Sequence, residues 1–466
     1  MKQLIRIANA KKLKKLAFLN KKKTESDSDA DLTSDDEEEV SKNMVGEFFN
    51  NRYFCLKYLG RGTFSRVWLV YDFQLNKFFA MKIQFEEYYK DSLLEIKFMK
   101  KINNLDNENS RVVKLYDSFV KGQTNHLIYE LLGCTLLEVF KVFNDDDEES
   151  IDSSEEEEEE ESTDSQEQTI PMNGIKRIIK DILKGLHEAH SKKIIHTDLK
   201  PENVMLNIES PRVEIIKEWF LKQNPSQLLI DLITNELPNN FLELDKNKRK
   251  GQKKKAKLRA LNKFKTLFNQ ERLRKAIDKS PRRYGLLDDI EKLQDFLNND
   301  VIAKIVDFGN GEIEGELVQE EIALRCYRCP ENIINEDYDV KSDIWVVGCM
   351  CYELITGEYL FDIPRKKKSI DRNREHLRQM YEVLGKMPRY LTEKCDFGED
   401  YFDQKGRIIK NKDYDHVPID DILATEFNFS DIEADNTSGF LKKLLEYDPK
   451  KRFSARQCLD DEWLNI

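Results

Sequence analysis

Residues 196–206, HTDLKPENVML, place one His, two carboxylates, a Lys and an Asn within eight consecutive positions between two apolar stretches. Such a density of proton-accepting, cationic and amide groups raises the question of which reaction needs them together. The short apolar runs IIHTD, NVMLNI and VIAKIVDFG each lead into polar residues or end in them. This pattern is typical of strands that deliver side chains to a site, so we expect these polar residues at strand ends and in loops.

Two features upstream of this stretch could bind or pair with anions. Gly60 and Gly62 lie between β-rich runs in YLGRGTFSRVWLVYD, and glycines at a tight hairpin allow the backbone to approach phosphates closely. A single G-x-G-x-x-S pattern is more often a plain turn. About twenty residues later, Lys82 lies inside the apolar run FFAMKI, where a buried ammonium needs an anionic partner. Glu95 in SLLEIKFMKK could supply it.

These groups require a sizeable folded scaffold. The chain has 466 residues, of which 39% are hydrophobic, enough for a large core and two lobes. In GIKRIIKDILKGLHEAH the apolar side chains fall on one helical face, which predicts a core helix: Ile175, Ile178, Ile179, Ile182, Leu183 and Leu186. There is no transmembrane run and no secretory signal, so we expect a soluble, intracellular protein. The eight cysteines are expected to be reduced, and C-x-x-C at Cys326–Cys329 lacks a second pair for a zinc site.

The net charge of −12 is unevenly distributed. Residues 1–23 carry only positive charge and residues 25–40 form an acidic run, which together predict a disordered tail, with a transit peptide as the alternative. A second acidic block at 144–168 has no Lys or Arg. The basic block 246–283 could be a localisation signal, a nucleic-acid contact, an intramolecular partner of the acids, or a solvated helix.

The order of motifs resembles the eukaryotic protein kinases from about residue 52 to the end. A Gly-rich loop, strand Lys, helix Glu, HTDLKPEN, DFG at 307–309, CPE at 329–331, DIW at 343–345 and the Arg of DPKKR follow in the family's sequence. The resemblance implies phosphoryl transfer. It also implies an α+β, bilobal protein-kinase fold, with a small antiparallel-sheet N-lobe and a larger, mostly helical C-lobe, and with ATP between them.

The resemblance assigns roles to individual residues. Asp198 would accept the substrate hydroxyl proton, and Lys200 would neutralise charge on the transferred group. Asn203 and Asp307 would hold Mg²⁺, and Lys82 with Glu95 would fix the α- and β-phosphates of ATP. His196 is expected to be structural. The further positions expected around ATP are Leu59, Gly60, Gly62, Val67, Ala80, Glu130 and Leu132, the last two at the hinge.

The chain most resembles the SR-protein kinases (SRPK-like) of the CMGC group. LRCYRCPE matches the group's R-x-Y-R pattern with Arg325 and Arg328, and 104 positions separate Asn203 from Asp307, a place where SR-protein kinases carry a long spacer. HTDLKPEN and REHLRQMYEVLG also resemble the LAMMER-type dual-specificity kinases, which lack the spacer. A pseudokinase scaffold that binds Arg/Ser-rich proteins is a third alternative.

The resemblance implies a serine/threonine kinase that uses ATP and Mg²⁺ on Arg/Ser-rich, SR-type splicing factors. Thr197 replaces the Arg that usually meets an activation-segment phosphate, and residues 307–331 contain no Ser or Thr, so the kinase is expected to be constitutively active. Glu358, Glu375 and Glu382 match acidic positions of the family's docking groove; the last two are seven apart, on one helical face.

The expected organisation is a tail at 1–51, an N-lobe at 52–131, and a C-lobe at 132–466 interrupted by the acidic insert 144–168 and a basic spacer at about 208–298. The spacer is expected to loop out of the domain and to contact chaperones or transport factors. We expect a monomer in cytoplasm and nucleus, with no direct nucleic-acid or membrane partner.

Overall fold

A computed structural model describes residues 44–144, 169–278, 285–364, 369–393, 398–409 and 415–466. The predicted acidic insert and most of the predicted tail lie outside these residues. The chain forms two compact units. The smaller unit takes its described residues from the segment ending at Tyr89, from Tyr116–Leu131 and from Pro211–Arg283. Lys90–Leu115, Leu132–Ser210 and Tyr284–Ile466 form the larger unit.

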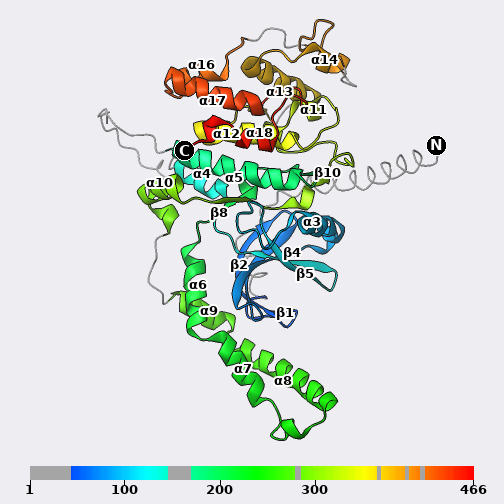
Figure 1. Ribbon diagram of the computed structural model, residues 1–466, viewed down its shortest axis with the longest axis vertical. Coiled ribbons are helices and arrows are strands. Elements are labelled where there is room, and N and C mark those ends of the chain that lie inside the picture. Colours follow the sequence, from blue (N-terminus) through cyan, green and yellow to red (C-terminus); the bar gives the residue numbers. More distant parts are fainter. Residues whose placement is uncertain (1–43, 145–168, 279–284, 365–368, 394–397, 410–414) are drawn as a thin grey trace, which may run out of the picture. The chain divides into compact units, whose positions relative to one another are not determined.

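The smaller unit is built on a six-stranded sheet with the order β1-β2-β3-β4-β6-β5 (Figure 1). Its strands are β1 (Phe48–Phe49), β2 (Tyr53–Gly62), β3 (Ser65–Asp72), β4 (Lys77–Gln84), β5 (Leu115–Lys121) and β6 (Thr124–Glu130). β1 pairs antiparallel with β2, with Phe48 opposite Phe54. The sheet therefore starts before residue 52, where we placed the boundary of the tail.

Strands β2 and β3 are buried on both faces. On one face Tyr53, Cys55, Trp68 and Val70 pack into a cluster with residues of β4 and β6. On the other face their neighbours in the chain, Phe54, Leu56, Leu69 and Tyr71, belong to a second cluster. Burial on both sides explains why YFCL and WLVY are continuous apolar runs instead of alternating ones.

The second cluster is completed by the long insert, which forms α6 (Pro211–Lys222), α7 (Pro225–Asn235), α8 (Lys246–Leu267) and α9 (Gln270–Asp278). In Figure 1 these helices (green) adjoin the sheet (blue). Phe220 stacks on Phe54 at 5.9 Å between ring centroids, and Phe264 meets Phe54 edge-on at 5.2 Å. The expectation that the whole spacer loops out therefore differs from the structure, because its aromatic side chains bury the outer face of β2 and β3.

The larger unit is mainly helical. Its long helices are α3 (Tyr89–Ile102), α5 (Met172–His190), α12 (Ser342–Thr356), α13 (Ser369–Leu384) and α17 (Asp431–Leu444). Shorter ones are α4 (Leu136–Asn144), α10 (Ile290–Asn299), α11 (Pro330–Ile333), α14 (Arg389–Thr392), α15 (Gly398–Tyr401), α16 (Ile419–Glu426) and α18 (Ala455–Leu459). The apolar face predicted for α5 is confirmed, since Ile175, Ile178, Ile179, Ile182, Leu183 and Leu186 are at most 1% exposed.

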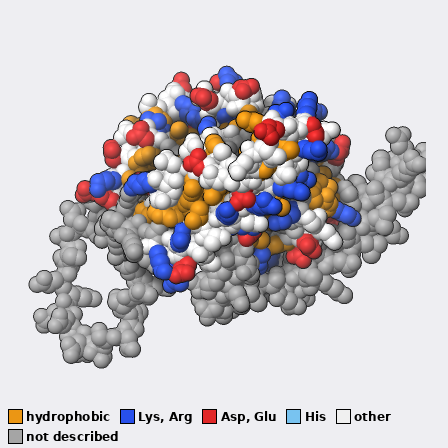
Figure 2. Space-filling view, turned by 90° about the horizontal axis from the view of Figure 1, so that it is seen from below, with side chains coloured by type: hydrophobic (Ala, Val, Ile, Leu, Met, Phe, Trp, Pro, Cys, Tyr) orange, Lys and Arg blue, Asp and Glu red, His pale blue; other side chains and the backbone are white. Residues whose placement is uncertain are grey.

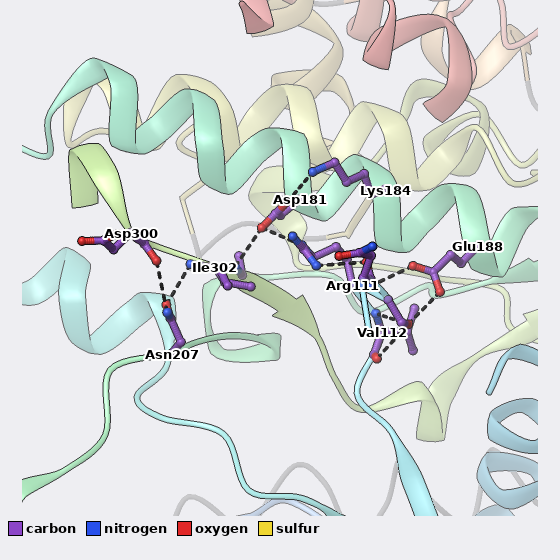
Figure 3. A network of polar contacts seen from close by, with 11 residues as sticks. Arg111, Val112, Asp181, Lys184, Glu188, Asn207, Asp300 and Ile302 are labelled. Carbon is purple, nitrogen blue, oxygen red and sulfur yellow. Dashed lines mark hydrogen bonds and ion pairs between the residues drawn. The ribbon is translucent and has the colours of Figure 1, made fainter. Parts of the chain in front are cut away.

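Two short two-stranded antiparallel sheets in the larger unit carry its part of the predicted site. β7 (Ile194–Ile195) pairs with β10 (Glu312–Ile313), and β8 (Val204–Leu206) pairs with β9 (Ala303–Ile305). Polar contacts connect the β8–β9 sheet to α5 and to the segment before β5 (Figure 3). Asp181 of α5 is 2.8 Å from Arg111 and accepts the backbone N–H of Ala303, and Asn207 accepts that of Ile302 at 2.8 Å.

No helix among the described residues is long and apolar enough to cross a membrane. The described cysteines are all free thiols, as expected: Cys55, Cys134, Cys326, Cys329, Cys349, Cys351 and Cys458. Burial raises the pKa of each of these thiols, so they are protonated and unreactive near neutral pH.

Candidate active site

The HTD sequence is held by one buried carboxylate, that of Asp343 at the start of α12. Its oxygens accept the backbone N–H groups of His196 at 2.8 Å and Thr197 at 3.1 Å. His196 is fully buried, and its Nε2 lies 2.9 Å from the carbonyl oxygen of Val306. Thr197 has a φ of 65°, a left-handed conformation that is strained for a β-branched residue. The two bonds from Asp343 thus hold a turn that directs Asp198 out of the core.

Asp198 collects three donors on one carboxylate oxygen. Lys200 Nζ lies 3.3 Å from Oδ2, Asn310 Nδ2 donates at 3.3 Å, and Asn203 Nδ2 donates at 3.4 Å. Asn203 also donates to the Asp198 backbone carbonyl at 2.7 Å. The carboxylate is one-quarter exposed, so it is positioned by the protein and still accessible to a substrate. The sequence reasoning missed Asn310, the residue after the DFG motif.

Asn203 and Asp307 stand at the ends of adjacent strands, β8 and β9, because Asn203 just precedes β8 and Asp307 follows β9 by two positions. The backbone N–H of Val306 donates to the Asn203 carbonyl at 3.0 Å, which fixes the two segments side by side. Asp307 has a φ of 63°, and its Oδ1 accepts the N–H of Gly309 at 3.3 Å. Glu95 of α3 is buried near the same turn, where a Cβ on Gly309 would lie 3.6 Å from Glu95 Oε2.

The other predicted ATP-binding residues lie in the smaller unit. Gly60 is opposite Val67 and Gly62 is opposite Ser65 across the β2–β3 hairpin. Lys82 is opposite Val67 on one side and Leu127 on the other. Leu59 lies next to Gly60 in β2, Ala80 is two residues before Lys82 in β4, and Glu130 ends β6. Leu132 is the first residue of the next segment of the larger unit.

The activation segment is ordered by Glu312, which is 6% exposed. Its carboxylate accepts the backbone N–H groups of Val318 at 3.0 Å and Gln319 at 2.9 Å, and the hydroxyl of Tyr338 at 2.7 Å. Burial raises the pKa of the Tyr338 phenol, so it stays protonated and donates. Charge-assisted bonds of this kind are about twice as strong as neutral ones.

Thr197 takes part in the same arrangement. Its hydroxyl donates to the Asn310 carbonyl at 2.8 Å, and Gln319 Nε2 donates to that carbonyl at 2.6 Å. The backbone carbonyl of Thr197 accepts the N–H of Ala323 at 2.7 Å. The position where most kinases carry an Arg therefore connects the catalytic loop to the activation segment through neutral hydrogen bonds.

The end of the segment is locked by buried polar pairs. Glu331 of CPE forms a bidentate pair with Arg452, at 2.7 and 2.9 Å, and both side chains are almost fully buried. Tyr327 donates its hydroxyl to Glu353 of α12, whose pKa burial raises to about 7. Arg325 donates to Asn373 at 2.5 Å, and burial lowers the pKa of its guanidinium to about 10. Arg328 lies 3.2 Å from Glu321.

Two of the three predicted docking carboxylates come together on α13. Arg378 lies between them, with its Nη2 at 2.8 Å from Glu375 Oε1 and its Nη1 against Glu382. Glu358 is exposed, in the turn after α12. The helical spacing argument thus places Glu375 and Glu382 on one face, but their charges are already shared with an arginine of the same helix.

The domain model described as "Protein kinase domain" matches residues 53–217 and 289–464. "Serine/threonine-protein kinase SRPK" of Physarum polycephalum is 31% identical, over 90% of this chain and 87% of that protein. "SRSF protein kinase 3" of Mus musculus is 26% identical over 93% and 92%, and "Protein kinase dsk1" of Schizosaccharomyces pombe is 26% identical over 90% and 81%. A solved crystal structure of a kinase domain has a TM-score of 0.57 at 21% identity, covering 90% of this chain and 97% of that one.

The fold, the catalytic loop and the matched domain define a protein kinase, and the chain belongs to that family. Within it, relatives that match over 90% of the chain or more include proteins named as SRPK and SRSF protein kinases, in agreement with the resemblance of the motifs. The pseudokinase alternative is disfavoured by this arrangement, because the side chains of Lys200 and Asn203 both contact the Asp198 carboxylate.

Protein kinases use ATP and Mg²⁺, and the donor set suits a hard cation. The Asp307 carboxylate offers oxygen, and because Asn203 Nδ2 is engaged by Asp198, the amide oxygen of Asn203 is its available ligand. No group of three or more His, Cys, Asp or Glu side chains that could hold a metal occurs among the described residues. Two protein ligands suffice for Mg²⁺, which keeps waters and binds substrate phosphates. Bound there, it would neutralise charge on the phosphates.

Proposed function

We propose that this kinase is active without activation-segment phosphorylation and transfers the γ-phosphate of ATP to serines of Arg/Ser-rich proteins. In this role Asp198 accepts the proton of the serine hydroxyl, and Lys200, 3.3 Å from that carboxylate, neutralises charge on the transferred group. The observation that carries the proposal is the set of bonds to Glu312, a carboxylate built into the segment itself.

Constitutive activity is supported by Glu312, whose carboxylate takes the role that a phosphate has in the activation segment of other kinases. In a phosphorylated kinase, a phosphate orders the segment by pairing with arginine. Here residues 307–331 contain no Ser or Thr, Thr197 stands in place of the Arg, and Glu312 accepts three hydrogen bonds without any modification. A fixed carboxylate cannot be removed by a phosphatase, so the ordered segment is the resting state.

The substrate class is supported by the relatives, two of which are named as SRPK or SRSF protein kinases, and by acidic side chains that suit arginine. The long spacer between Asn203 and Asp307 favours this group over the LAMMER-type kinases, which lack it. Glu358, Glu375 and Glu382 form the proposed docking set. Arginines of an extended substrate would compete with Arg378 for two of these carboxylates.

Cytoplasm and nucleus are the proposed locations, because the Lys-rich residues of α8 suit transport receptors. The chain is proposed to act as a monomer. Chaperones or transport factors are the proposed partners of the spacer.

The test is phosphorylation of arrayed peptides with MgATP: Arg-Ser repeats, Ser-Pro peptides and acidic Ser peptides. We expect serine phosphorylation of the Arg-Ser repeats above the other classes, by unmodified and by phosphatase-treated protein alike. Asp198→Ala should lower the rate at least about 10³-fold, because one essential catalytic group is lost. Preference for another class would overturn the substrate assignment. Loss of activity after phosphatase would overturn constitutive activity, and full activity of Asp198→Ala would overturn the assigned roles.

A further inference from the structure

The first half of helix α8 is a cationic surface without matching acids. Residues 246–257 carry eight positive charges and no carboxylate. These side chains are all exposed, and we call them the α8 basic face: Lys246, Lys248, Arg249, Lys250, Lys253, Lys254, Lys255 and Lys257. Figure 2 shows one face of the molecule, on which Lys and Arg side chains are interspersed with acidic and hydrophobic ones.

The two halves of α8 differ in how their charges are compensated. In the second half, Lys263 lies 2.5 Å and Arg259 3.7 Å from Glu236, and Lys265 lies 2.5 Å from Glu47. In the first half, Lys248 lies 3.3 Å from the capping residue Asp245, and among the described residues no other member of the basic face has a carboxylate partner.

This half of the helix repels itself. Four pairs of like charges stand at i and i+4, the spacing at which side chains are neighbours: 246/250, 249/253, 250/254 and 253/257. Each such pair destabilises the helix, because like charges at this spacing repel one another. A bound polyanion would remove that repulsion, so the face is suited to an acidic partner.

The described chain begins at the other end of the same helix. A Cβ on Gly46 would lie 3.2 Å from the Phe268 carbonyl oxygen, Val45 packs against the aromatic cluster, and Glu47 pairs with Lys265. The acidic run, Glu25–Glu39, ends eight residues before Glu47 and carries nine carboxylates with no Lys or Arg. The described residues among these, Val45, Gly46, Glu47, Lys265 and Phe268, belong to the smaller unit.

The acidic run is long enough to reach the basic face. At 1.5 Å per residue, Lys257 is about 12 Å and Lys246 about 28 Å along the helix from Lys265. The eight residues from Glu39 to Glu47 span up to about 26 Å when extended, and the fifteen residues of the run span up to about 50 Å. Both the near and the far end of the face are therefore within reach.

We propose that the acidic run, Glu25–Glu39, docks on the α8 basic face of the same molecule. The attachment consists of many exposed ion pairs, each of them weak and screened by salt, so it forms at low ionic strength and opens as salt is added. Because the basic face is also the surface proposed for transport factors, the run would compete with them for it.

Zero-length carbodiimide cross-linking of the full chain, followed by mass spectrometry, tests the proposal. The ion pairs Lys442–Asp420 and Lys443–Asp461, at 2.6 and 2.7 Å, calibrate the yield. At about 20 mM salt we expect links from the basic face to residues 25–39, in a yield independent of protein concentration. At about 500 mM salt, where the Debye length is a few ångströms, these links should fall at least about fivefold.

Two variants distinguish the acidic run from the second acidic block as the partner of the α8 basic face. Variant A has all nine carboxylates of the acidic run replaced by Asn or Gln; variant B has Glu155–Glu161 replaced by Gln. Measured as amine acetylation at low salt, the basic-face lysines should be about fivefold more reactive in variant A than in wild type, and unchanged in variant B. Equal reactivity in wild type and variant A overturns the proposal. The proposal is also overturned if the basic-face lysines become more reactive only in variant B or only when wild type is treated with nuclease. Cross-links that join residues 25–39 solely to residues 1–23 would overturn it as well.

Discussion

Replacing Phe264 by Ala should destabilise the smaller unit strongly. Phe264 is fully buried, and its ring meets those of Phe54 at 5.2 Å, Phe73 at 5.3 Å and Phe268 at 4.5 Å. Deleting a buried Phe side chain costs about 3–5 kcal/mol, because the transfer free energy is lost and a cavity remains. We therefore expect the free energy of unfolding of the smaller unit to fall by about 3–5 kcal/mol.

Urea and thermal denaturation followed by tryptophan fluorescence measure this effect. Trp219 of α6 lies 5.7 Å from the ring of Phe268, and Trp68 is buried in the sheet, so both report on the smaller unit. For a unit of about 150–250 residues, each kcal/mol shifts the midpoint temperature by about 2–4 °C, which gives a fall of about 6–20 °C.

Leu258→Ala is the matched control, since Leu258 lies on the same helix and is 58% exposed. A change within about 0.5 kcal/mol is expected there. If Phe264→Ala unfolded within about 1 kcal/mol of wild type, α8 would not be part of the core of this unit. The same reasoning predicts that deletion of about 212–296 exposes Phe54 and Leu56 of the sheet and impairs the enzyme. A spacer that looped out of the domain could be deleted without loss of activity.

Three further predictions concern the larger unit. Glu312→Gln should lower kcat at least about tenfold and speed proteolysis within 314–322, because charge-assisted hydrogen bonds of about 1.5–3 kcal/mol each are weakened. Glu316→Gln, at an exposed position, is the control, and an unchanged kcat in Glu312→Gln would contradict the role of Glu312. Burial raises the pKa of Glu353 from 4.5 to about 7, so its contribution to stability is fully present below pH 4.5 and is lost as the pH rises through 7, by about 3 kcal/mol. When the free energy of unfolding is measured from pH 5 to 8, Glu353→Gln should depend less on pH than wild type, and parallel pH profiles would refute the shift. Arg378→Ala should lower KM for a long Arg/Ser-rich substrate about threefold to fivefold, because Arg378 no longer competes for the docking carboxylates with an interaction of about 1 kcal/mol. KM for a short peptide should stay constant, and a higher KM for the long substrate would exclude this competition.

The catalytic residues could be predicted because their types and order are fixed by chemistry. Asp198, Lys200 and Asn203 fall within six positions of one loop, so their proximity followed from the sequence, and Asp307 is brought to them by the pairing of two short strands. Asn310 and Asp343 could not be assigned contacts in this way. Both act by donating or accepting hydrogen bonds across more than a hundred positions, and a single sequence has no signal for such bonds.

The insert shows where composition misleads. Its Lys and Arg content left several interpretations open, and we expected the spacer to loop out of the domain. The residues that decide its place are a few aromatics spaced among the charges, Phe220, Phe264 and Phe268. A signal was present in the sheet: the continuous apolar runs of β2 and β3 require a cover on each face. The sequence could not say that this cover comes from a segment about 150–210 positions further along the chain.

The insert also determines when this protein can finish folding during its synthesis. Strands β2 to β4 are complete once Gln84 has left the ribosome, yet the Phe268 that covers their outer face follows 184 positions later. At about 5–20 residues per second, translation of that interval takes about 10–40 seconds. Throughout it, Phe54, Leu56, Leu69 and Tyr71 form an open apolar surface on a nascent chain, the kind of surface that chaperones bind. The catalytic Asp198 is therefore synthesised before the small unit can close its core.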